Sequence, residues 1–379
     1  MANTLTNLIP IAYEALDVVS REVTGFIGAV NLDASAETIA KDQTVYSPVA
    51  PVNTTGNITP AMTVTAASDQ TIGTKSLVID SYKSAGFNWT AEEEFGVNSG
   101  GRFENIMRDQ IAQCFRVHIN EIEAALGVAA KNGASRAIGT TAGTAPVLAD
   151  FAGAQKILTD NGAPMTGRSC IIDTTAGVAL RSTSNLFKVN EAGDSGLLRN
   201  GVLGSLYGFD IRESAGVQTT TAGAQTGALV NGALSIGATA IVFDTATVNT
   251  TGVVAGDIIT IAGDTNKYVV VSGSTSTSGT ITIAAPGLRK AAADNAAITV
   301  FATSARNIAL SKNAITLATR LPKFQAGDQA VDRYVITDPQ TGIAFEIAMY
   351  PGYRMVKYEV SIAYGMSVIK PEHLAVIIG

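Results

Sequence analysis

The longest regular pattern of apolar positions lies between residues 103 and 131. Apolar side chains recur there at spacings of three, four and seven residues, which predicts an amphipathic helix with one buried face. The stripe comprises Phe103, Ile106, Met107, Ile111, Cys114, Phe115, His118, Ile119, Ile122 and Leu126. Such a helix would be about 40 Å long, and Asn132-Gly133 offers a C-terminal cap. We predict a structural spine whose core residues are Phe103, Ile111, Phe115, Ile119 and Ile122.

Two different patterns precede this helix. Residues 5–22 have helical spacing of apolar side chains, which predicts a short amphipathic helix. Its apolar positions are Leu8, Ile9, Ala12, Leu16 and Val19. From Gly25 to about Lys83 the chain becomes β-prone and is interrupted by the polar stretches PVNTTGN and ASDQ. This pattern favours a long two-stranded excursion over a compact sheet, with strands expected around Thr44–Tyr46, Thr63–Thr65 and Ser76–Ile79.

After the long helix the pattern alternates between helix and strand. Residues 147–215 predict, in order, a helix at Asp150–Asp160, a buried strand at Ser169–Asp173, a helix at Thr175–Phe187 and a strand at Gly208–Glu213. This alternation is typical of an α+β domain.

From Val217 to Ala302 the composition changes to Gly, Ala, Thr, Ser and Val with few charges. Short strands follow one another closely, which predicts a small all-β barrel or sandwich. The expected strands are Ala240–Phe243, Ile258–Ile261, Tyr268–Val271, Thr280–Ile283 and Ile298–Phe301. A helical and mixed pattern resumes at Asn307, so we interpret this block as a domain inserted into the α+β domain.

The C-terminal residues 333–379 contain three strand-like runs. These are YVITD, then IAFEIAMY joined to RMVKYEVSIAYGMSVI through a turn at Tyr350-Pro351-Gly352, and finally LAVII. We expect all of them to lie together in one closing sheet.

Composition adds a constraint on the surface. Only 15% of the 379 residues are charged and 46% are hydrophobic, which is unusually apolar for a protein that faces water on all sides. No apolar run approaches the ~20 residues that span a bilayer, and no basic residue precedes Arg21, which argues against a secretory signal. We therefore expect part of the surface to be buried between subunits.

Charge and cysteine content narrow the function further. The net charge of −6 disfavours a sequence-reading nucleic-acid binder, which normally carries a basic face, but leaves weak non-specific contact with DNA open. Cys114 and Cys170 are isolated and form no CxxC pattern, so we interpret both as reduced core residues.

The sequence contains no named catalytic motif. The two histidines, His118 and His373, are too sparse for a His-based metal site. The run Glu92–Glu94 follows Thr90, as expected of a solvated helix N-terminus, and Trp89 is interpreted as an anchor for the β excursion. We predict a protein that is not an enzyme, with no catalytic residues, no cofactor and no metal.

The order of these patterns resembles the major capsid proteins of tailed bacteriophages with the Hong Kong 97-type fold, over nearly the whole chain. The interruption at 217–302, with VVAGDIITIAG at Val253–Gly263 and RNIALSKNAITLATRLP after it, resembles the Salmonella short-tailed phage coat protein branch, which has an inserted β-barrel. The resemblance implies an α+β fold with seven parts. They are an N-terminal arm (1–39), an extended β loop (40–88), a spine helix with peripheral domain (89–146), an axial α+β domain (147–216), an inserted β-barrel domain (217–302), an axial return (303–332) and peripheral strands with the C-terminus (333–379).

The resemblance also implies the function and the partners. We expect hexamers and pentamers that close an icosahedral shell around double-stranded DNA, assembled in the host cytoplasm and located in the virion. Because the arm begins near Met1 and the spine near residue 102, we expect a separate scaffolding protein, with the portal protein as a further partner, non-specific contact with packaged DNA and no membrane.

The residues alone agree with this expectation on one point. An excursion of about 55 residues with little core of its own needs a partner to offset the entropy of ordering it. We therefore predict an assembly interface that includes Leu8, Ile9, Leu16, Tyr46, Val64 and Trp89.

Three alternatives stay open at this point. A tail-tube protein shares the low charge and β-richness, but not a long helix before an α+β domain. A surface-layer protein would be similarly rich in Thr, Gly and Ala but should carry an export signal. An enzyme that uses scattered carboxylates is the third class, and no motif favours it.

Overall fold

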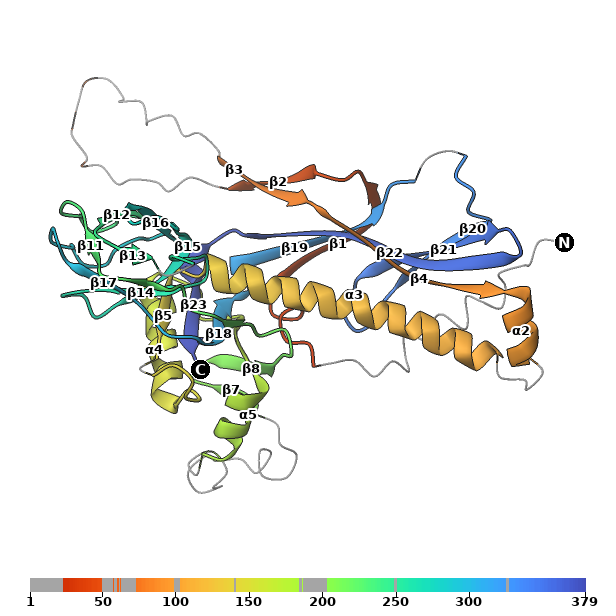
Figure 1. The fold of residues 1–379 in the computed structure, drawn as a ribbon, viewed down its shortest axis with the longest axis horizontal. Helices are drawn as coiled ribbons and strands as arrows, with labels where there is room; N and C mark the ends of the chain where they lie inside the picture. Colours follow the sequence, from red (N-terminus) through yellow and green to blue (C-terminus); the bar gives the residue numbers. More distant parts are fainter. Residues whose placement is uncertain are drawn as a thin grey trace.

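The computed structural model describes most of the chain as an elongated molecule, with one long helix running beside extended strands (Figure 1). The described residues are 23–49, 57, 60, 62, 73–98, 103–139, 141–183, 186, 203–248, 251–324 and 327–379. The predicted helix at 5–22 and the predicted strand at 63–65 lie outside these residues. The mixture of a few helices with much sheet agrees with the predicted α+β class.

Helix α3 (Phe103–Gly133, 31 residues) confirms the predicted long helix and its end at Gly133. Most of the predicted stripe is buried against the sheet. Ile106 is an exception, because its side chain is 36% exposed. It lies nine residues before Phe115, about two and a half turns away, so the two side chains point to opposite sides of the helix.

Three shorter helices accompany α3 in the described part of the chain. Helix α2 (Ala91–Asn98) precedes α3, and helices α4 (Leu148–Asp160) and α5 (Thr174–Arg181) follow it. The predicted helix at Thr175–Phe187 therefore ends earlier, at Arg181, where Ser182 forms the C-cap. Short 3₁₀ turns occur at η2 (Lys312–Ala314) and η3 (Pro371–His373).

One face of α3 is covered by a six-stranded sheet centred on the long strand β22. The strands are β1 (Asn31–Ile39), β4 (Ser81–Thr90), β19 (Ile315–Pro322), β20 (Asp332–Thr337), β21 (Ala344–Gly352) and β22 (Met355–Val368). The predicted turn at Tyr350-Pro351-Gly352 is wrong, because these residues pair with Lys357, Val356 and Met355 inside the sheet. The chain turns instead at residues 353–354, where Arg354 has a φ of 57°.

A two-stranded antiparallel sheet projects from this body. Strand β2 (Gln43–Val49) pairs with β3 (Gly73–Ile79) from Gln43 opposite Ile79 to Val49 opposite Gly73. Its base is held by a small apolar cluster of Ile39, Leu77 and Ile79 with two residues of the six-stranded sheet. Beyond that base the strand residues are mostly exposed.

A second sheet of thirteen strands forms the other end of the molecule. Its α+β part contains β5 (Arg136–Ile138), β6 (Arg168–Ile172), β7 (Ser205–Leu206), β8 (Phe209–Glu213), β18 (Ser304–Ser311) and β23 (Leu374–Ile378). Two predictions are corrected here. The segment after Asn307 forms strands β18 and β19, with no α-helix, and LAVII is β23, which joins this sheet and not the one containing β20–β22.

Residues 219–300 are the β-rich block that the composition predicts. They form β9 (Thr219–Thr220), β10 (Gln225–Thr226), β11 (Ala228–Val230), β12 (Ala240–Asp244), β13 (Thr247–Val248), β14 (Ile258–Ile261), β15 (Lys267–Ser272), β16 (Gly279–Ile283) and β17 (Ala297–Val300). The block has an apolar core of its own. Its sheet is nevertheless continuous with the α+β part, because β15 pairs with β5.

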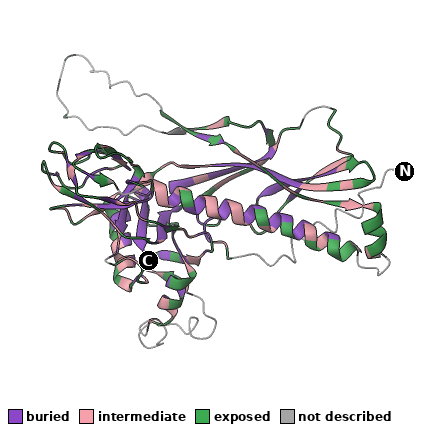
Figure 2. Ribbon diagram, viewed as in Figure 1, coloured by how far each residue is buried: buried purple, intermediate pink, exposed green. Residues whose placement is uncertain are grey.

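The largest core lies between α3 and the two sheets, and it includes residues from both ends of the chain. Figure 2 shows that buried residues concentrate there and in the α+β part, whereas α2 and the outer strands are exposed. A separate core joins α4 and α5 to the thirteen-stranded sheet.

Candidate assembly surface

The projecting pair β2–β3 is the first candidate surface. Tyr46 is 68% exposed and Val78 is 43% exposed, so the pair presents apolar side chains that the rest of the chain does not cover. Tyr46 lies opposite Ser76 in the register. Tyr82 holds the base of the pair, because its hydroxyl donates a hydrogen bond to the carbonyl oxygen of Ile39.

Trp89 lies elsewhere, on β4 where that strand leads into α2. Its Nε1 donates to Oε1 of Gln110 on α3 at 2.7 Å, which ties the end of the strand to the long helix. The next residue begins a capping box: the Thr90 N–H donates to Glu93 Oε2 at 2.9 Å, and the Glu93 N–H donates to Thr90 Oγ1 at 3.3 Å. The Thr90 N–H and the Thr90 hydroxyl both donate to the Glu93 carboxylate, and these two hydrogen bonds lower the pKa of Glu93. The capping box confirms the predicted helix N-terminus.

A shallow apolar groove runs between β4 and α3. One part, of about 380 Å³, is lined by residues that include Phe87, Ile106 and Cys114. An adjoining part, of about 300 Å³, contains Trp89, and both parts share Gln110. Ile106 is therefore exposed into a groove that has apolar walls, which is a surface suited to contact with another protein.

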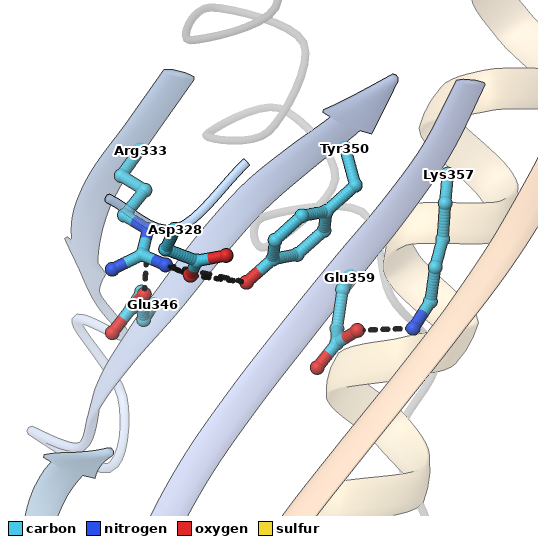
Figure 3. A network of polar contacts seen from close by, with 6 residues as sticks. All are labelled: Asp328, Arg333, Glu346, Tyr350, Lys357 and Glu359. Carbon is cyan, nitrogen blue, oxygen red and sulfur yellow. Dashed lines mark hydrogen bonds and ion pairs between the residues drawn. The ribbon is translucent and has the colours of Figure 1, made fainter. Parts of the chain in front are cut away.

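A polar groove of about 250 Å³ lies on the six-stranded sheet, and every residue drawn in Figure 3 except Lys357 lines it. Arg333 on β20 lies at the centre of this groove. Its guanidinium contacts Asp328, and its Nε lies 3.6 Å from Glu346 Oε1. The guanidinium carbon also lies 4.3 Å from the ring centroid of Phe324. Burial raises the pKa of Glu346, and the charge of Arg333 opposes that effect. Tyr350 donates to Asp328 Oδ2 at 3.3 Å.

The charges of this groove are balanced. Its lining contains the basic residues Lys83, Lys323 and Arg333 and the acidic residues Asp328, Glu346 and Glu359. Such a mixture complements a polar protein surface better than it complements a polyanion.

A buried carboxylate, Glu123 on α3, forms a junction that the sequence analysis missed. Its Oε1 accepts hydrogen bonds from the backbone N–H groups of Gly25 and Phe26, the latter at 2.7 Å, and Oε2 accepts from Ile27 N–H at 3.1 Å. The Ser214 hydroxyl donates to Oε1 at 2.6 Å. Glu123 is 2% exposed. The one signal in the sequence is its position directly after Ile122, at the border of the buried stripe.

The structure brings four of the five predicted spine residues together and describes two of the six predicted interface residues. Ile111, Phe115, Ile119 and Ile122 belong to one core, and Phe103 begins the helix. Tyr46 and Trp89 occupy different elements, and Leu8, Ile9, Leu16 and Val64 lie outside the described residues.

The histidines and cysteines lie in the interior. His118 is 2% exposed, its Nε2 lies 3.0 Å from the Val360 carbonyl oxygen, and burial lowers its pKa. His373 is 7% exposed. Cys114 and Cys170 are free and buried, as predicted, and burial raises the pKa of Cys114 to about 11. In the described part of the chain, no group of three or more His, Cys, Asp or Glu residues is placed to hold a metal ion.

Comparison with solved structures identifies the architecture. A chain in the capsid structure of cyanophage P-SCSP1u superimposes with a TM-score of 0.52 at 12% identity, covering 95% of this chain and 89% of that one. The chain therefore has the fold of that capsid chain. A structure from Mycobacterium phage Che8 matches with a TM-score of 0.48 at 15% identity, covering 94% of this chain and 92% of that one. No family model and no curated protein matches the sequence.

No helix within the described ranges is both long and apolar enough to cross a membrane.

Proposed function

We propose that this chain is the major capsid protein of a tailed bacteriophage, a structural protein that assembles with copies of itself into the head shell. The observation that carries the proposal is the fold likeness to the cyanophage capsid chain, which extends over 95% of this chain and 89% of that one.

The shape of the subunit supports self-assembly. The pair β2–β3 leaves the body with Tyr46 and residues 73–76 exposed, and two ordered strands without a core are marginal in water. A neighbouring copy that covers Tyr46 and Val78 would remove apolar area from water and so stabilise the pair.

We assign the Hong Kong 97-type parts to the chain as follows. Residues 1–39 form the arm, 40–88 the extended loop, 89–146 and 333–379 the peripheral domain, and 147–216 with 303–332 the axial domain. Residues 217–302 form an inserted barrel like that of the Salmonella short-tailed phage branch. The separate apolar core of that block supports the assignment, whereas the pairing of β15 with β5 makes it less independent than an isolated barrel.

In this proposal hexamers and pentamers close an icosahedral shell around double-stranded DNA, in the host cytoplasm, with a separate scaffolding protein and a portal protein as partners. The protein is not an enzyme. The interface includes the predicted residues Leu8, Ile9, Leu16, Tyr46, Val64 and Trp89.

Negative-stain electron microscopy tests the proposal directly. The full chain is expressed alone and with the gene products encoded beside it, and particles are recovered by sedimentation. Closed shells support a capsid protein. Tubes would instead identify a tail-tube protein, and soluble subunits under both conditions would contradict the proposal.

A further inference from the structure

A buried carboxylate, Asp257, lies where the β-rich block meets the body of the subunit. It is fully buried and directly precedes β14. The Val254 N–H donates to its Oδ2 at 2.8 Å, and the Gly223 N–H donates to both carboxylate oxygens at 3.2 Å. A Cβ at residue 223 would lie 2.6 Å from Oδ2, so glycine permits this close approach. Asp257 therefore joins two loops of the block.

Two cations of the body lie near this carboxylate. Lys131 comes from the last turn of α3, and its Nζ donates to Thr220 Oγ1 on β9 at 3.3 Å. Arg306 comes from β18 and is 1% exposed, and its Nη1 donates to Ser304 Oγ at 2.7 Å. Within the described residues neither cation forms a direct ion pair with Asp257. Burial lowers the pKa of both cations, that of Arg306 to about 10, and the negative charge of Asp257 opposes this effect.

The other contacts of the block with the body include one short strand pairing and a few apolar residues. Strand β15 pairs with β5 at two residue positions. Ile258 and Val269 belong to the main core, but apolar contacts are non-directional. A carboxylate that is attracted by cations on two different elements adds a fixed direction to these contacts.

The charges of this cluster add little net stability. Burial raises the pKa of Asp257, although its backbone donors and the two cations act in the opposite direction. Nε and Nη2 of Arg306 have no hydrogen-bond partner among the described residues. Replacing a buried ion pair by apolar side chains is often neutral or stabilising, whereas removal of one partner leaves a buried charge unpaired and is strongly destabilising.

We propose that Asp257 is a positioning residue for the β-rich block: its charge, attracted by Lys131 and Arg306, fixes the orientation of residues 219–300 on α3 and β18. Removing the charge leaves the block folded, because the apolar core of the block contains no member of this cluster, but its orientation becomes variable. This role belongs to the single subunit, so it holds whatever the subunit assembles into.

The test compares Asp257→Asn with Asp294→Asn in the full chain. Asparagine keeps an oxygen for the two backbone donors but carries no charge. Asp294 lies on the surface of the same block, where its Oδ1 accepts a hydrogen bond from the Gly232 N–H at 2.8 Å, so it controls for loss of a carboxylate. Asp257→Asn should lower the midpoint of thermal unfolding by roughly 5–10 °C, because Arg306 is left buried and unpaired. Asp294→Asn should stay within about 2 °C of the unsubstituted chain.

A second readout separates orientation from stability. Spin labels on Val117→Cys and Ile236→Cys report the distance from α3 to the block by double electron–electron resonance in the free subunit. These two side chains are 54% and 67% exposed, whereas Cys114 and Cys170 are buried and stay unlabelled. The distance distribution should be narrow in the unsubstituted chain and in the control variant, and broad in Asp257→Asn.

The double variant Asp257→Asn/Arg306→Met distinguishes a positioning role from a purely stabilising one. It leaves no fully buried charge unpaired in the cluster, so its thermal midpoint should return to within about 3 °C of the unsubstituted chain, while its distance distribution stays broad. The same variant decides the matter if Asp257→Asn alone does not fold. A narrow distribution in the double variant would overturn the inference, because the apolar contacts and the β15–β5 pairing would then be sufficient. An equally broad distribution in the control variant would overturn it as well.

Discussion

Ile119 and Ile122 are fully buried between α3 and the rest of the main core. An unpaired carboxylate there would cost several kcal/mol, which is comparable to the stability of a whole domain. We predict that Ile119→Asp or Ile122→Asp abolishes accumulation of soluble subunit. Val117→Asp is the matched control on the same helix, because Val117 is 54% exposed. Expression and sedimentation measure the result, and normal particles from either buried variant would contradict the assigned facing of α3.

The buried His118 predicts a pH dependence of stability. Burial lowers its pKa in the folded state, so as the pH falls the unfolded chain, with an ordinary pKa of about 6.5, takes up the proton first. Stability is therefore unaffected by this group above that pH and is lost as the pH falls below it. Denaturant unfolding at pH 7 and pH 5 should show a smaller loss for His118→Gln than for the wild type. An equal loss would show that His118 does not titrate on unfolding.

At the residue scale, periodicity predicts burial where a side chain lies near the centre of a stripe, as for Phe115 and Ile119. It fails at the border. Ile106 is apolar but points into an open groove, and Glu123 is charged but buried because backbone donors from residues 25–27 reach it. Those donors are nearly a hundred positions away in the sequence, so no local pattern contains them.

At the element scale, the strands of the inserted block are predictable because each has its own short apolar run bounded by turn residues. Strands β18 and β19 are not, because they are buried on both faces and so lack the alternation of apolar and polar residues that identifies a strand. Strand β23 was assigned to the wrong sheet for a different reason. Its partners β18 and β5 are fixed by tertiary pairing, which the sequence of β23 does not specify.

The block itself gives a prediction at this scale. Residues 217–302 contain a separate core. The two ends of the block lie close together, because β9 near its start pairs with β18, which follows directly after its end. The isolated fragment should therefore fold and melt cooperatively. The fragment should be less stable than the block within the full chain. In the fragment β15 lacks its partner strand β5, and Ile258 and Val269 lack their contacts with the main core. Circular dichroism with thermal melting measures this. A random-coil spectrum without a transition would mean that the block folds only as part of the whole.

At the scale of the whole molecule, α3 connects parts that would otherwise be separate. It packs on β4 and β22 of the six-stranded sheet and on β15, β18 and β23 of the other sheet. A single helix in contact with both sheets makes the body one structural unit, and β2–β3 is attached to it through a small apolar cluster at its base. Assembly contacts made outside this unit can therefore be removed without removing the core of the body.

Deleting residues 2–22 tests that separation. Among the described residues the main core begins at Phe26, and we expect the truncated subunit to remain folded. If residues 2–22 contact a neighbouring copy, deleting them removes interface area between copies. Stable interfaces bury on the order of 1,200–2,000 Å². The truncated chain should therefore stay monomeric and fail to close shells. Sedimentation and circular dichroism decide the outcome together. Normal shells would refute an interface role for the segment, and a monomer unfolded throughout would show that residues 2–22 contribute to the subunit's own core.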